Sequence, residues 1–127
     1  MHGWTPLQYA SHMGHHEIVE LLLRTFNANL INLQPPPLHL ACLNTHKRVV
    51  ERLLLAGADA NVQDERDRNI MHILAGTGNV ELIKLLMPFV KEESMRKLDK
   101  DGKKPWERAI DKEVQQILKP KEVTKTA

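Results

Sequence analysis

Three histidines and a glutamate stand close together near the start of the chain, in the stretch SHMGHHEIVELLL at residues 11–23. Imidazole and carboxylate groups are common metal ligands, and His12 and His16 have the i, i+4 spacing that places two side chains on one face of a helix. Gly14 lies between them, however, and a glycine at this place is typical of a helix end. A break there would direct the two rings apart, so the sequence predicts neither a metal site nor a cofactor.

Two other short patterns with catalytic associations are weaker still. The GTGN stretch at residues 76–79 lacks the GxxxxGK[ST] spacing with which a phosphate-binding loop holds a nucleotide. Glu92 and Glu93 lie in a charged segment, where neighbouring carboxylates are ordinarily solvated. We therefore predict that the protein is not an enzyme. The alternative, metal-dependent hydrolysis at the histidines, requires one zinc ion per chain.

The composition of the 127-residue chain limits the remaining classes of protein. Aromatic residues make up 4% and hydrophobic residues 42%, so the core must consist mainly of aliphatic side chains, which suits packed helices. The net charge of +2 comes without a concentrated stripe of Lys and Arg, which argues against nucleic acid as a partner. No apolar run approaches the roughly 20 residues that span a membrane, and residues 1–10 do not resemble a secretory signal. With a single cysteine, Cys42, these features predict an intracellular protein, cytoplasmic or nuclear, with no membrane partner.

A sequence pattern recurs along the chain with a period near 33 residues. Its starts are separated by 31, 33 and 35 residues, and each of the first three copies precedes a run rich in Leu, Val and Ile. Repetition at this period indicates one supersecondary unit that is stacked several times. The four copies are TPLQYASHMGH at 5–15, PPLHLACLNTH at 36–46, NIMHILAGTGN at 69–79 and, more faintly, KPWERAIDK at 104–112.

The first copy shows how each unit is expected to fold. Thr5 can cap a helix whose first position is Pro6, where a missing N–H and a fixed φ are no disadvantage. That helix should end near Met13, with Gly14 in a left-handed conformation, and a second helix should run over about residues 16–24. The second helix carries an apolar stripe too wide for a lone surface helix, so each helix pair must be covered by neighbouring units.

With its T-P-L-H-x-A opening and its G-A-D-x-N close, the pattern resembles the ankyrin repeat over about residues 2–119. The resemblance implies an all-α solenoid of about four helix–turn–helix units joined by short β-hairpin fingers. Three repeats are recognisable, and the fourth is a degenerate C-terminal capping repeat. The units are expected at about 2–34, 35–67, 68–98 and 99–119, followed by a disordered tail at 120–127.

The junctions between units depart from the family pattern in three places. The triple proline at residues 35–37 predicts a short or irregular first finger. In the second finger Asp67 replaces the usual tip glycine, which predicts a less tight turn. Pro88 is expected to end the second helix of the third unit early.

The two ends of the array differ in sequence. The fourth unit keeps an apolar face, which includes Trp106, Ile110 and Val114, opposite a polar face, as a capping repeat requires. The outward face of the first unit looks like that of an internal repeat. We therefore expect the chain either to come from a longer array or to be covered by a partner at that end.

The ankyrin resemblance also implies structural roles for residues that could otherwise do chemistry. His39 and His72, in PLHLA and MHILA, match the family histidine that bonds to the backbone of a neighbouring finger. His15 falls in the family's GH turn. Cys42 stands where the family has a small buried alanine, which implies an inert packed thiol rather than a nucleophile.

For function, the resemblance implies a non-enzymatic module that binds a protein partner through a concave surface of fingers and first helices, as an adaptor, inhibitor or regulatory segment. Trp4, Met13 and Leu43 are the expected apolar anchors, while Arg66 and Arg68 would favour an acidic segment of the partner. The predicted partner-binding residues are Trp4, His12, Met13, Leu43, Asn44, Glu65, Arg66, Arg68, Thr77, Lys100 and Lys103.

Two alternatives stand beside this interpretation. Trp4 could pack only on its own repeat, with the arginines forming ordinary free surface. The whole chain could instead be a structural module that stacks on another domain or self-associates through its first unit.

Overall fold

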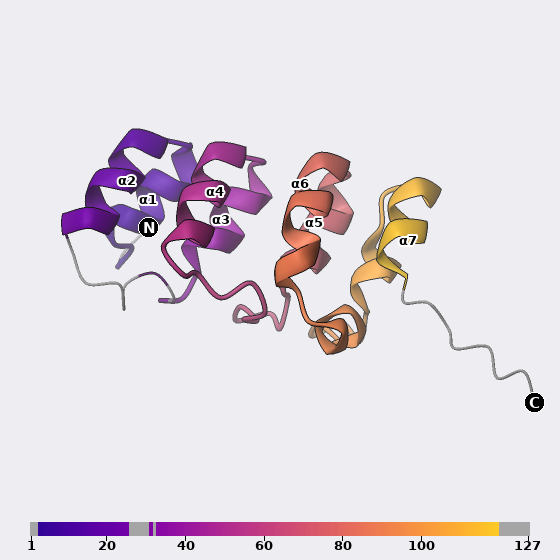
Figure 1. Cartoon of the computed structure of the whole chain (residues 1–127). Coiled ribbons are helices and arrows are strands. Elements are labelled where there is room, and N and C mark those ends of the chain that lie inside the picture. Colours follow the sequence, from indigo (N-terminus) through magenta and orange to yellow (C-terminus); the bar gives the residue numbers. More distant parts are fainter. Residues whose placement is uncertain (1–2, 26–30, 32, 120–127) are drawn as a thin grey trace, which may run out of the picture.

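The computed structural model describes residues 3–25, 31 and 33–119, which form a row of helix pairs (Figure 1). All regular structure in these ranges is helical, which confirms the expected all-α solenoid. The units comprise α1 (Pro6–Met13) and α2 (His16–Thr25), α3 (Pro37–Leu43) and α4 (Lys47–Leu55), and α5 (Ile70–Thr77) and α6 (Val80–Leu86). The 3-10 helices η2 (Met87–Phe89) and η3 (Glu92–Arg96) lead to a fourth unit of η4 (Pro105–Arg108) and α7 (Lys112–Leu118).

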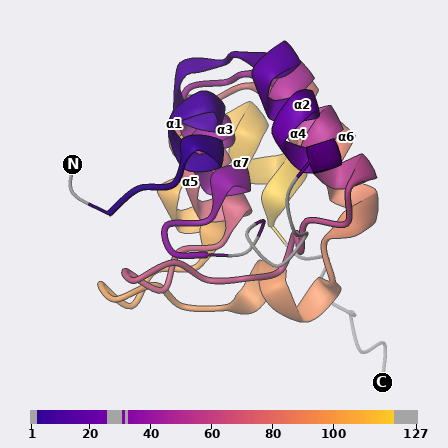
Figure 2. The ribbon, with the colours of Figure 1, turned by 90° about the vertical axis from the view of Figure 1, so that its left-hand side faces the viewer.

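Contacts between the units join neighbours along the row. Helix α1 packs on α3, α3 on α5 and α5 on η4, while α2 packs on α4. Viewed along the stack, the first helices of the first three pairs line up in one row and the second helices in another (Figure 2). One continuous aliphatic core runs between the two rows, because each pair buries apolar side chains against the next. Its fully buried members include Leu38, Leu53, Leu74, Leu82, Leu86 and Leu118.

The local signals at the start of the chain form the predicted helix ends. The Thr5 hydroxyl accepts a hydrogen bond from the N–H of Gln8 at 3.1 Å, and the Gln8 side chain accepts one from the N–H of Thr5 at 2.7 Å. Gly14 follows the helix with φ at 79°, in the left-handed region. A Cβ atom at Gly14 would lie 2.5 Å from the ring of His46, so packing as well as conformation requires glycine here.

The second and third fingers are tight turns, with no strand in the residues that the structure describes. In the finger at 64–68 the N–H of Asp67 donates to the carbonyl of Asp64 at 2.9 Å, and in the finger at 99–103 that of Gly102 makes the equivalent bond at 2.9 Å. The loosening expected at Asp67 is therefore wrong. Its φ is 59°, against 74° at Gly102, because aspartate is one of the few residues that tolerate a left-handed conformation. Most of the first junction, residues 26–30 and 32, lies outside the described residues.

The third junction ends its second helix early, as Pro88 predicted. Helix α6 stops at Leu86 and the chain continues into η2. The side-chain oxygen of Asn61 fixes the following segment, since it accepts from the N–H of Lys91 at 2.7 Å and the hydroxyl of Ser94 at 2.8 Å.

The fourth unit differs from the expected helix pair, because its first helix is reduced to the short η4. Ile110 consequently lies in a connection rather than on a helix face, and its side chain is 62% exposed instead of covered. Val114, on α7, is fully buried as predicted for the apolar face. The predicted tail at 120–127 lies outside the described residues.

The first unit exposes an apolar side chain whose counterparts in the other units are buried. The third residue of each second helix is Ile18 in α2, Val49 in α4, Leu82 in α6 and Val114 in α7. Ile18 is 48% exposed, whereas its three counterparts are fully buried. Leu21, one helical turn further along α2, is 59% exposed. No helix among the described residues is long and apolar enough to cross a membrane.

Candidate functional site

A cleft of about 660 Å³ opens where the second and third fingers meet the first helices of the last three units. Its floor is the exposed side of α5, and Leu43 at the end of α3 forms one border. The opposite border comes from η4 and the third finger. Its complete lining is Leu43, Arg66, Arg68, His72, Ile73, Gly76, Thr77, Asp99, Lys100, Asp101 and Arg108.

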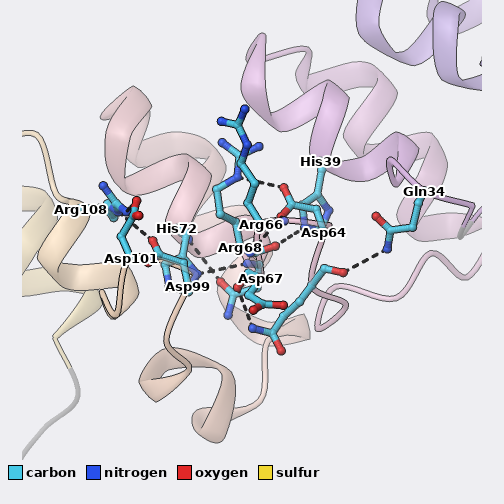
Figure 3. Close-up of polar contacts among 12 residues, drawn as sticks. Gln34, His39, Asp64, Arg66, Asp67, Arg68, His72, Asp99, Asp101 and Arg108 are labelled. Atoms are coloured by element: carbon cyan, nitrogen blue, oxygen red, sulfur yellow. Dashed lines mark hydrogen bonds and ion pairs between the residues drawn. The ribbon is translucent and has the colours of Figure 1, made fainter. Parts of the chain in front are cut away.

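A bond from the third residue of α5 holds the third finger beside the cleft. Nε2 of His72, which is labelled in Figure 3, donates to the carbonyl of Lys103 at 2.8 Å. Nδ1 of the same ring accepts from the N–H of Asn69 at 3.1 Å. One ring nitrogen therefore donates and the other accepts, which is the pattern of a neutral imidazole. Burial lowers the pKa of His72, which keeps the ring in this form.

The second finger is held in the same way from the preceding unit. Nε2 of His39 donates to the carbonyl of Arg68 at 2.8 Å. Its Nδ1 is buried without a partner, because Pro36 stands where the third unit has Asn69 and a proline has no N–H to donate. Burial lowers the pKa of His39 as well. Both bonds confirm the role that the sequence predicted for the two histidines.

Each finger also carries an ion pair built on a buried carboxylate. Asp64 accepts from the N–H groups of Arg66 and Arg68 at 2.9 and 3.0 Å, and its other oxygen lies 2.9 Å from Nε of Arg68. Arg68 is therefore committed to its own finger.

At the third finger the cation comes from η4. Nε of Arg108 lies 2.8 Å from the carboxylate of Asp99, and Nη2 of Arg108 lies 2.7 Å from that of Asp101. Burial alone would raise the pKa of Asp99. The Arg108 guanidinium and the N–H groups of Lys103 and Asp101 outweigh that effect and hold this pKa below its ordinary value. The Asp99 carboxylate is thus ionised and fixed at the edge of the cleft.

Two further cations at the cleft remain available to a ligand. Arg66 and Lys100 are exposed, and neither side chain forms an ion pair with the described part of the chain. The N–H of Lys100 donates to the carbonyl of Arg66 at 3.0 Å, so the two finger tips are bonded directly to each other. The fold thereby presents two unpaired positive charges on adjoining finger tips.

The structure divides the predicted partner-binding residues into three groups. Leu43, Arg66, Arg68, Thr77 and Lys100 meet in the cleft. Glu65 and Lys103 are exposed on the same fingers but do not line it.

The remaining predicted residues lie at the first two units. The Trp4 ring is half-buried against its own unit, 5.2 Å from Tyr9 and 5.4 Å from His12 between ring centroids. The Asn44 side chain donates to the carbonyl of His12 at 2.8 Å, which links the ends of α1 and α3. Met13, beside them in sequence, is 58% exposed.

The sequence did not indicate Ile73, Gly76, Asp99 and Arg108 as site residues, and it assigned His72, which also lines the cleft, a structural role only. An alignment of the repeat copies would have indicated two of these residues, Ile73 and Arg108. Arg108 is the fourth residue of η4, the place that Ile73 has in α5, so both belong to the face that lines the concave side. The pairing of Arg108 with a finger carboxylate has no such signal, because it depends on the packing of the unit.

The groups that first suggested catalysis are dispersed. His12 lies on α1 and His16 begins α2, with Gly14 separating the two helices. Within the described ranges, no group of three or more His, Cys, Asp and Glu side chains is arranged to hold a metal ion. Cys42 is fully buried, and burial raises the pKa of its thiol.

Stacked helix pairs with turns projecting beside a concave cleft define a repeat solenoid. The chain belongs to the ankyrin-repeat family: a family model described as ankyrin repeats in three copies matches residues 1–64 and 38–126. Proteins of this family are generally modules for protein–protein interaction and are typically non-enzymatic.

Similar proteins occur in several organisms and are much longer than this chain. The nuclear factor NF-kappa-B p105 subunit of Gallus gallus is 36% identical over 90 residues, which is 64% of this chain and 9% of that protein. Ankyrin repeat protein nuc-2 of Neurospora crassa is 30% identical over 76% of this chain and 9% of its own length. Ankyrin repeat and SOCS box protein 9 of Homo sapiens is 38% identical over 56% of this chain and 23% of its own length. The chain therefore spans less than a quarter of the length of each of these three relatives.

Proposed function

We propose that this chain is a non-enzymatic binding module, which holds a protein partner in the cleft between its fingers and first helices and so serves as an adaptor, inhibitor or regulatory segment. The observation that carries the proposal is the cleft itself. It combines an exposed apolar border, Leu43 at 45% exposure, with the unpaired cations of Arg66 and Lys100. Apolar area supplies affinity, and fixed charges on the rim supply orientation and attraction over distance.

A second observation supports a cleft that is rigid before binding. The turns on its border are closed by backbone bonds and by buried carboxylates, and a histidine of the preceding unit holds each turn in place. A partner then loses little affinity to the ordering of these loops.

The test is affinity capture from a native cell lysate, with the partner identified by mass spectrometry. A double variant, Leu43→Glu with Arg66→Glu, should lose the protein that the unmodified chain captures. The matched control, Leu55→Glu with Arg48→Glu, changes one exposed leucine and one exposed arginine on α4, away from the cleft, and should retain it. Circular dichroism must show equal helical content in all three proteins. Retention by the cleft variant would refute the proposal.

A second candidate function, self-association, rests on the exposed α2 face of the first unit. Ile18 is 48% exposed, while its counterparts in the other units are fully buried beneath a neighbouring unit. A second copy that covers this face would bury the same kind of surface. Light scattering over a range of concentrations should then show a dimer that Ile18→Lys with Leu21→Lys abolishes. A monomer at every concentration would exclude this candidate.

A further inference from the structure

Gly76 is a glycine that the fold does not need. It lies inside α5, where glycine is less favourable than alanine by up to about 1 kcal/mol. Its φ is not in the left-handed region, and a Cβ atom built on it would meet nothing within 4 Å. Neither backbone conformation nor close packing therefore explains its presence. What distinguishes it is its place in the lining of the cleft.

The same place in the other first helices carries a side chain. The seventh residue is His12 in α1, Leu43 in α3 and Gly76 in α5. Because α3 packs on α5, the loss of a side chain at Gly76 leaves a notch beside Leu43. We call this notch, which Leu43, Ile73, Gly76 and Thr77 line, the Gly76 notch. Its surroundings are mainly aliphatic, so it suits an apolar side chain.

The charges around the Gly76 notch indicate what accompanies that side chain. The lining of the cleft holds four cationic residues and two acidic ones, and His72 is kept neutral. Both acids, Asp99 and Asp101, are already paired with Arg108. The unpaired charges are those of Arg66 and Lys100, on the finger tips that border the cleft. A partner that fits this arrangement carries carboxylates on the side that faces the fingers.

We propose that the cleft binds an acidic peptide segment that places one apolar side chain in the Gly76 notch while its carboxylates pair with Arg66 and Lys100. The inference rests on the proposed function, because it names the class of partner that the same cleft takes. The notch sets the position of the segment, since one apolar anchor in a partly enclosed site carries much of the binding energy. The two cations set its charge and make binding sensitive to salt.

The experiment starts from a random peptide library displayed on phage and selected against the unmodified chain. Selected peptides are synthesised, and their affinities are measured by fluorescence anisotropy. Gly76→Phe fills the notch, and Gly76→Ala is its control, because a methyl group leaves most of the space open. Arg66→Gln with Lys100→Gln removes the two charges. Arg48→Gln with Lys84→Gln, two exposed cations on α4 and α6, is the matched control.

The expected result is a set of peptides with carboxylates flanking an apolar residue. Gly76→Phe should weaken their binding at least about tenfold, while Gly76→Ala leaves it within about threefold. The Arg66 and Lys100 variant should weaken it about three- to tenfold at low salt and less at high salt, and the matched control should not. Thermal melting should show that Gly76→Ala and Gly76→Phe are both folded.

Four results would overturn the inference, and they differ in what becomes of the proposed function. Peptides that lose binding with Leu43→Glu but keep it with Gly76→Phe, or that carry no acidic residues, would refute the inference and leave the proposed function intact. A failure to enrich any peptide, or peptides that bind every cleft variant as tightly as the unmodified chain, would refute both.

Discussion

His39 and His72 occupy the same place in neighbouring units and make the same bond to the next finger, yet they differ on the other side of the ring. Nδ1 of His72 accepts from the N–H of Asn69, whereas Nδ1 of His39 is buried without a partner because Pro36 has no N–H. A buried acceptor without a partner costs about 1–3 kcal/mol. The second unit thus keeps the bond from His39 to the carbonyl of Arg68 in the next finger, but it lacks the bond between Nδ1 and the N–H of the residue that caps its own helix.

The first unit shows that a histidine is not essential at this place. The amide of Gln8 donates to the carbonyl of Pro35 at 2.8 Å, and its oxygen accepts from the N–H of Thr5 at 2.7 Å. Both bonds of His72 are therefore reproduced by a side chain that does not titrate. The comparison teaches that the repeat selects for one donor and one acceptor at this position, and that the cap residue decides whether the acceptor is used.

The largest difference is expected when each ring is removed. His72→Ala should lower the free energy of unfolding by about 3 kcal/mol, because it leaves both the Asn69 N–H and the Lys103 carbonyl without their partner. His39→Ala removes one bond and should cost about 2 kcal/mol. Urea denaturation above about pH 7.5, where the imidazoles are neutral, measures both. Equal losses would show that the bond to Asn69 contributes nothing.

Acidification is expected to have the next largest effect. Burial lowers the pKa of both rings, so below the ordinary value of about 6.5 the unfolded chain takes up protons that the native state resists. Stability should therefore be highest above pH 6.5 and fall as the pH drops below that value, because the unfolded chain binds the protons more tightly than the native state does. Denaturation at a series of pH values measures the slope. A flat profile over this range would contradict the assignment of two neutral rings.

Replacement of His72 by glutamine, the residue of the first unit, separates the contribution of the two hydrogen bonds from that of the titratable ring. His72→Gln should form the two bonds that Gln8 forms and lower the stability above pH 7.5 by no more than about 1 kcal/mol. It should also remove the part of the acid-induced loss of stability that comes from His72, since the glutamine side chain does not titrate. His39→Gln is the companion measurement. A large loss at neutral pH would mean that the shape of the ring, rather than its bonds, is required.

The smallest effect should come from restoring the missing cap. Pro36→Ala supplies an N–H for Nδ1 of His39, and Pro36→Thr adds the hydroxyl cap that Thr5 gives the first unit. We expect Pro36→Thr to raise the free energy of unfolding by about 0.5–1 kcal/mol, with Pro36→Ala between it and the unmodified chain. Thermal melting is sensitive enough to rank the three proteins. A lower melting temperature for both variants would show that the packing of the proline outweighs the bond.

Much of the fold could be predicted from the sequence, because the signals are local. The cap at Thr5 and the stop at Gly14 each depend on a few neighbouring residues, and the period repeats such a local pattern along the chain; the structure places the cap and the stop as expected. The looser turn expected at Asp67 is wrong, because the expectation rested on the missing family glycine, and aspartate also tolerates the left-handed conformation that the turn needs. Ile110 was misjudged because the shortening of the fourth unit's first helix has no local signature.

The site was less predictable, because its properties arise from stacking. The resemblance to the ankyrin repeat implied the concave side and the residues Leu43, Arg66 and Lys100, which line the cleft. It treated Arg68 as equivalent to Arg66, although Asp64, four residues earlier, binds it. The Gly76 notch is visible only when α3 and α5 lie side by side, since it is an absence of atoms between two helices.

The neighbour-to-neighbour packing of the helix pairs also determines how the molecule opens. A unit at either end detaches by breaking one interface, whereas a unit inside the stack must break two. Partial unfolding should thus begin with the units at the two ends of the described stack. In hydrogen–deuterium exchange, the amides of the two inner units, on α3 and α5, should be the last to acquire deuterium. The floor of the cleft would then stay formed while the ends of the stack open and close.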